Sequence, residues 1–500
     1  MADFDLAVIG GGINGAGIAR DAAGRGLRVV LFEQNDLASG TSSASSKLIH
    51  GGLRYLEHGE FRLVRAALAE REILLRAAPH LIRPLRFVLP LDPARRSPLL
   101  LRLGLLLYDW IGRRRILPPT RELDLVTDAA GQPLRSAFQH AFEYSDCFAD
   151  DARLVVVNAV DAAARGAAIR TRTRVARAER SDLWRLVVNA RGRRDEVTAR
   201  ILVNATGAWV ETLARTVLRQ ASSRPRVRLD KGSHIVVRRL YEHDRAYILQ
   251  AADRRVVFTI PLDRDFTLIG TTDRSFSGDP ATVTPTPEEI EYLCGVVSEY
   301  FRASIAAADV VWAFAGVRAL YDDGARKPQD VGRDYALTLD ERFGEAPLLT
   351  VYGGKITTYR RLAEDALDRL AHFFTRSRPW TAQSPLPGGD FPYDGIAALT
   401  GHTLQQWPFL TDDHARRLTH TYGTRVQAVL GNATRLDDLG QRFGVDLTAA
   451  EVRYLMRNEW AQSADDVLWR RSKLGLRLTP AQTTALADFM VKELAAKANG

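Results

Sequence analysis

The sequence predicts an α/β fold in which a parallel sheet, an antiparallel sheet and a C-terminal helical region are combined. Three observations predict it. The N-terminus places a glycine turn and an alanine-rich helix between two apolar segments, residues 226–275 are β-branched and partly alternating, and the C-terminal segment spaces its apolar residues as helices do. The 500 residues exceed what one hydrophobic core supports, so two or three domains are expected.

Composition and charge narrow the class of protein. Apolar residues make up 46% and charged residues 26%, which is ordinary for a globular chain. The net charge of +9 favours an anionic partner, whether a phosphorylated metabolite, a membrane surface or a nucleic acid. Cys147 and Cys294 form no repeated spacing, so we expect neither disulfides nor a metal site, and a reducing compartment fits. We expect no membrane span and no signal peptide, because no apolar run reaches about 18 residues and the N-terminus lacks a charged leader.

The N-terminal segment predicts a dinucleotide site. Residues 6–9 and 27–32 read as strands on either side of a glycine turn and a helix, which makes a βαβ unit. Gly10, Gly12 and Gly15 form the pattern G-x-G-x-x-G, whose glycines permit a tight turn and whose helix offers amides to a pyrophosphate. Glu33 ends the second strand, where a carboxylate can bind the ribose of an adenosine. A Rossmann-like domain is expected, for NAD or for FAD.

Two later glycine turns favour FAD. The strand "RILVN" ends at Gly207, although this turn alone could be an ordinary strand end. The strand "LLTVY" ends at Gly353, Gly354 and Lys355, and a helix start near Thr357 beside a lysine suits the negative charge of a reduced flavin. A separate nicotinamide cofactor would need a second G-x-G-x-x-G pattern between a strand and a helix, and we find none in the sequence. A single FAD is therefore predicted.

The segment "GTSSASSKLIHGG" (40–52) predicts a cofactor cradle of hydroxyls and backbone, with a flexible solvent loop as the alternative. It ends at His50, Gly51 and Gly52, and Arg54 and Tyr55 follow just ahead of a helix expected at 62–78. A lone histidine is more often structural. With glycines and an arginine beside it, His50 becomes a candidate base.

Arginine binds phosphate bidentately, so a phosphorylated substrate would need arginines in its site. Arg54, Arg318 and Arg333 are the candidates, because each adjoins an apolar stretch and lies outside the charge runs. A solvated surface position is the competing interpretation for each of them.

Residues 95–115, "RRSPLLLRLGLLLYDWIGRRR", form an apolar segment between basic clusters. Too short to span a bilayer, the segment has the composition of an interfacial helix that docks on an anionic membrane surface. A buried core helix with arginines at its ends is an equally good interpretation of the sequence alone.

The chain resembles the flavin-dependent, respiratory glycerol-3-phosphate dehydrogenases over nearly its whole length. The motifs that carry the resemblance are "VIGGGINGAGIARDAAGRGL", "TSSASSKLIHGGLRYLEHGEFRLV", "EYSDCFADDARLV", "KGSHIVV", "IGTTD", "YGGKITTYR" and "ADDVLWRRSKLGL". It implies an FAD enzyme that oxidises sn-glycerol 3-phosphate to dihydroxyacetone phosphate and passes electrons to membrane quinone. It also implies a peripheral place on the cytoplasmic face of the inner membrane and no nucleic-acid partner, and it leaves a homodimer open.

The resemblance also implies roles for individual residues. The residues expected to take part in catalysis are His50, Arg54, Arg318 and Lys355. Those expected at the substrate are Arg54, Tyr55, Thr271, Arg318 and Arg333. Those expected at the cofactor are Gly10, Gly12, Asn14, Gly15, Glu33, Thr41, Ser42, Ser46, Gly51, Gly207, Gly353, Gly354, Lys355 and Thr357. The base stays open among His50, Lys355 and His234.

The expected domains are an FAD-binding domain (1–80, about 150–215 and 340–376), a substrate domain (81–149 and 216–339) and a C-terminal helical domain (390–500) joined by a Pro/Gly-rich linker. Rival functions are a soluble oxidase that reduces oxygen, an oxidase of amines or amino acids, and a flavin-bearing scaffold without catalysis, since fold does not fix function.

Overall fold

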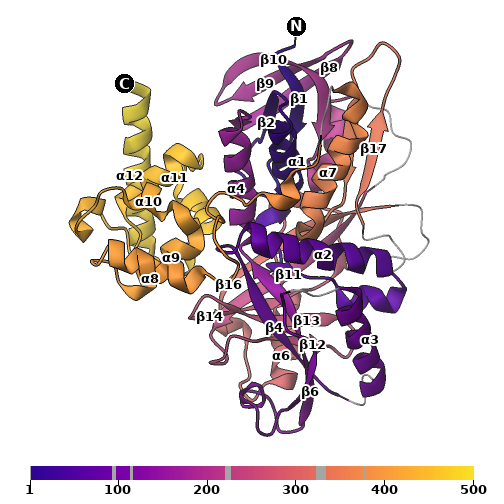
Figure 1. The fold of residues 1–500 in the computed structure, drawn as a ribbon, viewed down its shortest axis with the longest axis vertical. Coiled ribbons are helices and arrows are strands. Elements are labelled where there is room, and N and C mark those ends of the chain that lie inside the picture. The colour runs from indigo at the N-terminus through magenta and orange to yellow at the C-terminus, as the bar shows by residue number, and fades with distance from the viewer. Residues whose placement is uncertain are drawn as a thin grey trace.

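The computed structural model describes residues 2–92, 97–112, 116–219, 227–322, 334–374 and 378–499, and of residues 54, 57, 58 and 497–499 it describes the backbone alone. Two sheets form the body, and a group of helices at the C-terminus lies to one side of them (Figure 1). The predicted fold class is confirmed.

The first sheet is the Rossmann-like one. Its strand order is β17-β18-β10-β1-β2-β7, and β1 pairs in parallel with both β2 and β10. An antiparallel extension of β8 and β9 joins it through β10. The strands are β1 Phe4–Ile9, β2 Val29–Phe32, β7 Ala168–Arg170, β8 Thr173–Arg180, β9 Trp184–Ala190, β10 Arg193–Asn204, β17 Ala336–Asp340 and β18 Leu348–Tyr352.

Residues of β1 alternate between two cores. Leu6 and Val8 pack against the helices α1 Ile13–Gly24, α4 Asp151–Ala164 and α7 Tyr359–Arg369, whereas Ala7 and Ile9 face a cluster around Trp184. This alternation follows from the two-residue period of a strand that is covered on both faces. The sheet is thereby fixed from both sides, and the carboxyl ends of its parallel strands share one edge.

The second sheet is mainly antiparallel, with the order β15-β11-β14-β13-β12-β4-β6-β3, and β16 and β5 join it at β11 and β6. Its strands are β3 Leu48–Ile49, β4 Ile82–Pro90, β5 Arg121–Asp124, β6 His140–Ala149, β11 Val227–Arg238, β12 Ala246–Gln250, β13 Val256–Leu262, β14 Phe266–Gly270, β15 Arg274–Ser275 and β16 Val310–Tyr321. Because β3 pairs with β6, the chain enters this sheet at residue 48, inside the first segment expected for the FAD-binding domain.

The remaining helices cover the sheets or build the C-terminal unit. They are α2 Phe61–Ala77, α3 Pro98–Ile111, α5 Val210–Thr216, α6 Pro287–Tyr300, α8 Ile396–Gln406, α9 Asp412–Tyr422, α10 Val426–Leu430, α11 Ala449–Asn458, the π-helix η13 Asp466–Arg471 and α12 Pro480–Asn499. The C-terminal helices bury a core of their own between Trp407 and Met490. The Pro/Gly-rich stretch before them is packed in its described part, since Leu386 is buried and its N–H donates to Ala77 O.

Helix α3 presents apolar side chains outward. Leu105 and Tyr108 are buried, but five large apolar residues of the same helix are 53–78% exposed, namely Leu99, Leu100, Leu103, Leu106 and Trp110. A helix buried in the core would not show such a face, so the alternative of a core helix does not apply. The arginines at 95, 96 and 113–115 lie outside the described residues. In the part of the chain that the structure describes, we find no helix that is both long and apolar enough to span a membrane.

Candidate active site

A cavity of about 690 Å³ opens at the edge where the parallel strands end. Its lining comes from the residues that follow β1, β2, β10 and β18, and from β11 and β16 of the second sheet. Ligands of open α/β sheets bind at this edge. The cavity therefore lies where the glycine pattern and Glu33 predict a dinucleotide.

The turn after β1 and the start of helix α1 leave no room for a side chain at Gly10 or Gly15. Gly10 has φ +115°, and a Cβ on Gly15 would lie 1.9 Å from Gly10 O. Gly12 caps helix α1, which carries no side-chain cap and no acid in its first turn. The positive end of the helix is thus open toward the cavity, as binding of a pyrophosphate requires.

Glu33 stands beside this turn. Its Oε2 accepts the N–H of Gly11 at 2.7 Å, and its Oε1 accepts the N–H of Asn35 at 2.8 Å. Burial raises the pKa of Glu33, while the two backbone hydrogen bonds oppose the change. Each oxygen keeps a second lone pair, so the carboxylate can still accept hydrogen bonds from a ribose.

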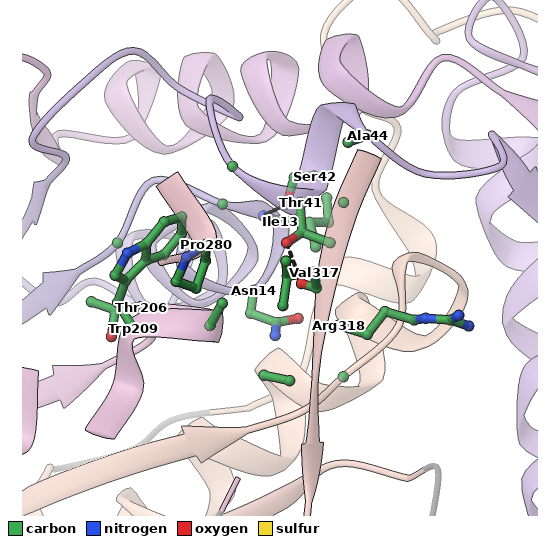
Figure 2. A pocket seen from close by; sticks show the side chains of 18 of the residues that line it. Ile13, Asn14, Thr41, Ser42, Ala44, Thr206, Trp209, Pro280, Val317 and Arg318 are labelled. Atoms are coloured by element: carbon green, nitrogen blue, oxygen red, sulfur yellow. Dashed lines mark hydrogen bonds between the residues drawn. The ribbon is translucent and has the colours of Figure 1, made fainter. Parts of the chain in front are cut away.

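The hydroxyl-rich loop lines the cavity from Ser39 to Ser46. Ser42 Oγ accepts the N–H of Ile13 at 3.0 Å, and Thr41 Oγ1 donates to Val317 O at 2.5 Å; Figure 2 shows both bonds as dashed lines. These bonds tie the loop to helix α1 and to strand β16. The loop is held in place, and the flexible alternative does not apply to it.

The turn after β18 meets the start of α1. Asn14 Nδ2 donates to Gly353 O at 3.0 Å, and a Cβ on Gly354 would lie 2.7 Å from Asn14 Nδ2. Thr357 Oγ1 accepts the N–H of His50 at 3.3 Å. Positions near 14, 50 and 355 are thereby joined at one place, although they are far apart in the sequence.

Lys355 and His50 both line the cavity. Lys355 Nζ lies 3.9 Å from the centre of the Tyr55 ring, and no described residue offers it a hydrogen-bond acceptor. A buried ammonium without an acceptor is suited to an anionic ligand. Burial lowers the pKa of His50, so its imidazole is neutral near pH 7 and can accept a proton.

His234, on β11, lies on the same cavity and stacks on Phe314. Its Nε2 lies 2.9 Å from Ser46 Oγ. Burial lowers the pKa of His234 to about 3, which makes it a much weaker base than an ordinary imidazole.

Arg318 and Thr271 face each other across Gly232. A Cβ built on Gly232 would lie 2.6 Å from Thr271 Oγ1 and 3.5 Å from Arg318 Nη2. Arg318 Nη2 donates to Asp273 Oδ1 at 2.9 Å and remains 39% exposed. The guanidinium is therefore oriented and still reachable, as a phosphate-binding arginine must be.

Other expected residues have different surroundings. Gly207 lines the cavity, but Gly15 and Gly51 do not appear in its lining. The N–H of Gly51 donates to Tyr108 OH at 2.8 Å, and Tyr108 OH donates to Asp146 at 2.9 Å. The side chain of Arg54 and the whole of Arg333 lie outside the described residues.

Sequence reasoning missed several lining residues, such as Asp230, Pro280, Phe314, Arg174 and Trp209. Trp209 follows the Gly207 turn directly, whereas the other four come from strands and loops that carry no glycine pattern. Asp230 and Phe314 reach the cavity from β11 and β16, two strands that are far apart in the sequence and pair in the second sheet. A single sequence holds no local signal for this pairing.

The described residues fit FAD. The closely packed glycine turn excludes side chains where a pyrophosphate would lie, and Asn14 Oδ1, Lys355 Nζ and His234 Nδ1 are buried polar atoms without a partner among the described residues. Buried groups of this kind need a hydrogen-bond partner. All three belong to lining residues, so a polar ligand in the cavity can supply it.

Comparison with protein families gives two matches. Residues 5–360 match the model of FAD dependent oxidoreductases, and residues 379–499 match the C-terminal domain of alpha-glycerophosphate oxidase.

Individual relatives agree with these matches. The chain is 53% identical to a glycerol-3-phosphate dehydrogenase of Pseudomonas aeruginosa over 98% of its own length and 95% of the relative's. It is 47% identical to the aerobic glycerol-3-phosphate dehydrogenase of Escherichia coli (98% of each chain) and 49% identical to a D-erythritol 1-phosphate dehydrogenase of Brucella abortus (97% of each). A glycerol-3-phosphate dehydrogenase of Bacillus halodurans, solved with FAD, superposes with a TM-score of 0.76 at 26% identity, covering 99% of this chain and 95% of that one.

Proposed function

The chain belongs to the FAD-dependent oxidoreductases and, among them, to the glycerol-3-phosphate dehydrogenases, and on this premise we propose that it oxidises sn-glycerol 3-phosphate to dihydroxyacetone phosphate. One observation carries the proposal: a single cavity is lined by the glycine turn, His50, Lys355 and Arg318.

FAD is the cofactor, and when bound it supplies the acceptor for the hydride that leaves C2 of the alcohol. The residues proposed to hold it are the turn Gly10–Gly12, Glu33, the loop Thr41–Ser46, Gly207 and the turn Gly353–Gly354. Lys355 would balance the negative charge of the reduced cofactor, since its buried ammonium group has no acceptor among the described residues.

The chain's own residues divide the remaining work. We assign the removal of the C2 hydroxyl proton to the neutral imidazole of His50, which lines the cavity with Lys355. Burial lowers the pKa of His234 to about 3, and its Nε2 is engaged by Ser46. Lys355 stabilises the alkoxide character that this removal creates. Arg318 binds the phosphate, together with Arg54 and Arg333 as the sequence predicts.

Replacing Arg318 with alanine should raise the KM for sn-glycerol 3-phosphate by about tenfold to 100-fold, since a hydrogen bond to a charged group contributes about 1.5–3 kcal/mol. Arg274→Ala is the control, because it removes the same charge from a nearby exposed residue that is not in the cavity lining. Steady-state kinetics separate the two variants. An unchanged KM in Arg318→Ala would refute the phosphate role.

The acceptor is proposed to be a membrane quinone, which the protein would reach by docking on the cytoplasmic face of the membrane through α3. The exposed apolar face of α3 supports this placement, and the arginines that flank it in the sequence suit anionic lipid.

The double variant Leu100→Ser, Trp110→Ser should bind anionic phospholipid vesicles at least about tenfold more weakly than the unaltered protein, because each apolar side chain buried in lipid contributes about 1.5–3 kcal/mol. Vesicle co-sedimentation measures it. Val126→Ser, which alters an exposed apolar residue elsewhere, should bind normally. Equal binding by all three proteins would show that α3 is not the docking surface.

A second substrate deserves a direct comparison, because one relative of 49% identity is named for D-erythritol 1-phosphate. Both polyol phosphates carry an oxidisable hydroxyl and an anionic end. We expect kcat/KM for sn-glycerol 3-phosphate to exceed that for D-erythritol 1-phosphate by about tenfold or more. The reverse order would move the assignment to the longer substrate, and activity only with glycine or sarcosine would move it to amine oxidation.

A further inference from the structure

The C-terminal unit reaches the cofactor cavity through one short segment. The π-helix η13, Asp466–Arg471, belongs to the C-terminal helices but lies against two loops of the first sheet. These are the loop after β2 and the turn between β7 and β8. Figure 1 shows the C-terminal helices on the α4 side of the body.

The loop after β2 is held through Asp36, which is 1% exposed. Its Oδ2 accepts Arg470 Nε at 2.6 Å and Arg471 Nη1 at 2.9 Å, and its Oδ1 accepts Arg471 Nη2 at 2.9 Å. Both carboxylate oxygens of Asp36 thus accept hydrogen bonds from guanidinium groups of η13.

The turn between β7 and β8 is held through Arg172. Its Nη2 donates to both oxygens of Asp466, at 2.7 and 2.9 Å. Arg470 donates to the same carboxylate, and so it links Asp466 to Asp36. Asp466 is fully buried. Removing one charged side chain from this network would leave a buried charge without its partner. The ion pairs of the network therefore stabilise one another.

The two loops together line the part of the cavity that is next to Glu33. Arg172 N–H donates to Asn35 O at 2.9 Å, and Thr173 N–H donates to Glu33 O at 2.8 Å. Asn35 and Glu33 line the cavity from one loop, and Thr173 and Arg174 line it from the other. The charges of Asp36 and Arg172 also bear on the pKa of Glu33, the first raising it and the second lowering it.

We propose that Asp466 and Arg470 are positioning residues for the adenosine half of FAD, so that the C-terminal unit completes the cofactor site. They touch neither the cavity nor the reacting atoms. They fix the two loops that present Glu33, Asn35 and Thr173 to it. The proposal depends on FAD binding alone, so its failure would not bear on the identity of the substrate.

The test is the affinity for FAD of the variants Asp466→Asn and Arg470→Gln, measured by the fluorescence of flavin released on dilution of the holoprotein. We expect the FAD dissociation constant to rise by about tenfold or more in each, and Arg470→Lys, which keeps the charge, to recover part of the affinity.

The matched control is Arg477→Gln. Arg477 also joins the C-terminal unit to the body, through Asp263 at 2.7 Å and Asp265 at 2.5 Å, but these partners do not line the cavity. This variant should keep FAD. If the η13 variants fail to fold, Arg172→Gln tests the same network from the other side. Arg172 is half-buried in its turn, and this variant should also lose FAD. Normal FAD affinity in folded η13 variants, or equal loss in Arg477→Gln, would overturn the proposal.

Discussion

Replacing His50 with asparagine is expected to lower turnover by about 10²-fold or more while FAD stays bound. The backbone N–H of His50, and not its imidazole, donates to Thr357 Oγ1, so the exchange removes the base without removing this anchor. An amide of similar size cannot accept the hydroxyl proton. Stopped-flow reduction of the flavin by substrate measures the step directly.

The pH dependence provides a second test of His50. Because burial lowers the pKa of His50 below the value of about 6.5 for free imidazole, kcat/KM should stay constant through about pH 6.5 and fall only at lower pH, where the base becomes protonated. The acid limb should disappear in His50→Asn. His402→Asn, at an exposed position, is the control for the substitution itself. Near-normal turnover in His50→Asn would leave Lys355 as the base.

Gly15→Ala is expected to yield protein that purifies without FAD. A Cβ at position 15 would lie 1.9 Å from Gly10 O and 3.4 Å from Val8 Cγ1, and the first of these contacts is with backbone that cannot move aside. Helix α1 must then shift away from β1, and its N-terminal amides leave the place where the pyrophosphate binds. The ratio of flavin absorbance to protein absorbance reports the loss.

Gly295→Ala is the matched control for this change. Gly295 also lies in a helix, α6, but a Cβ there meets nothing within 4 Å, so the exchange should be neutral or stabilise the helix by up to about 1 kcal/mol. Gly12→Ala, whose Cβ would meet only Ser42 Oγ at 3.2 Å, should weaken FAD binding and leave the fold intact. Full FAD occupancy in Gly15→Ala would contradict our interpretation of the glycine turn.

The N-terminal unit could be predicted from the sequence because its signals are local. Glycines, an alanine-rich helix and apolar strands each act within a few residues, and helix α1 begins directly after the glycine pattern. The sequence predicts that the second strand begins at residue 27, but it begins at Val29, because Leu27 N–H still bonds to Ala22 O in the helix cap.

Other features depend on tertiary contacts that a single sequence does not reveal. The apolar segment around Tyr108 read equally well as a core helix, and only its packing decides which side is exposed. The expected linker is fixed at Leu386 by a bond to Ala77. The arginines of η13 bind Asp36, which lies more than four hundred residues away in the chain, so no local pattern reveals this contact.

The most direct test of the central claim is an anaerobic titration of the purified holoprotein with sn-glycerol 3-phosphate, followed by the visible absorbance of oxidised flavin. Our account predicts that the absorbance is bleached in proportion to the substrate added and recovers when a soluble quinone is supplied. Flavin that remains bound and oxidised in the presence of excess substrate would contradict the account.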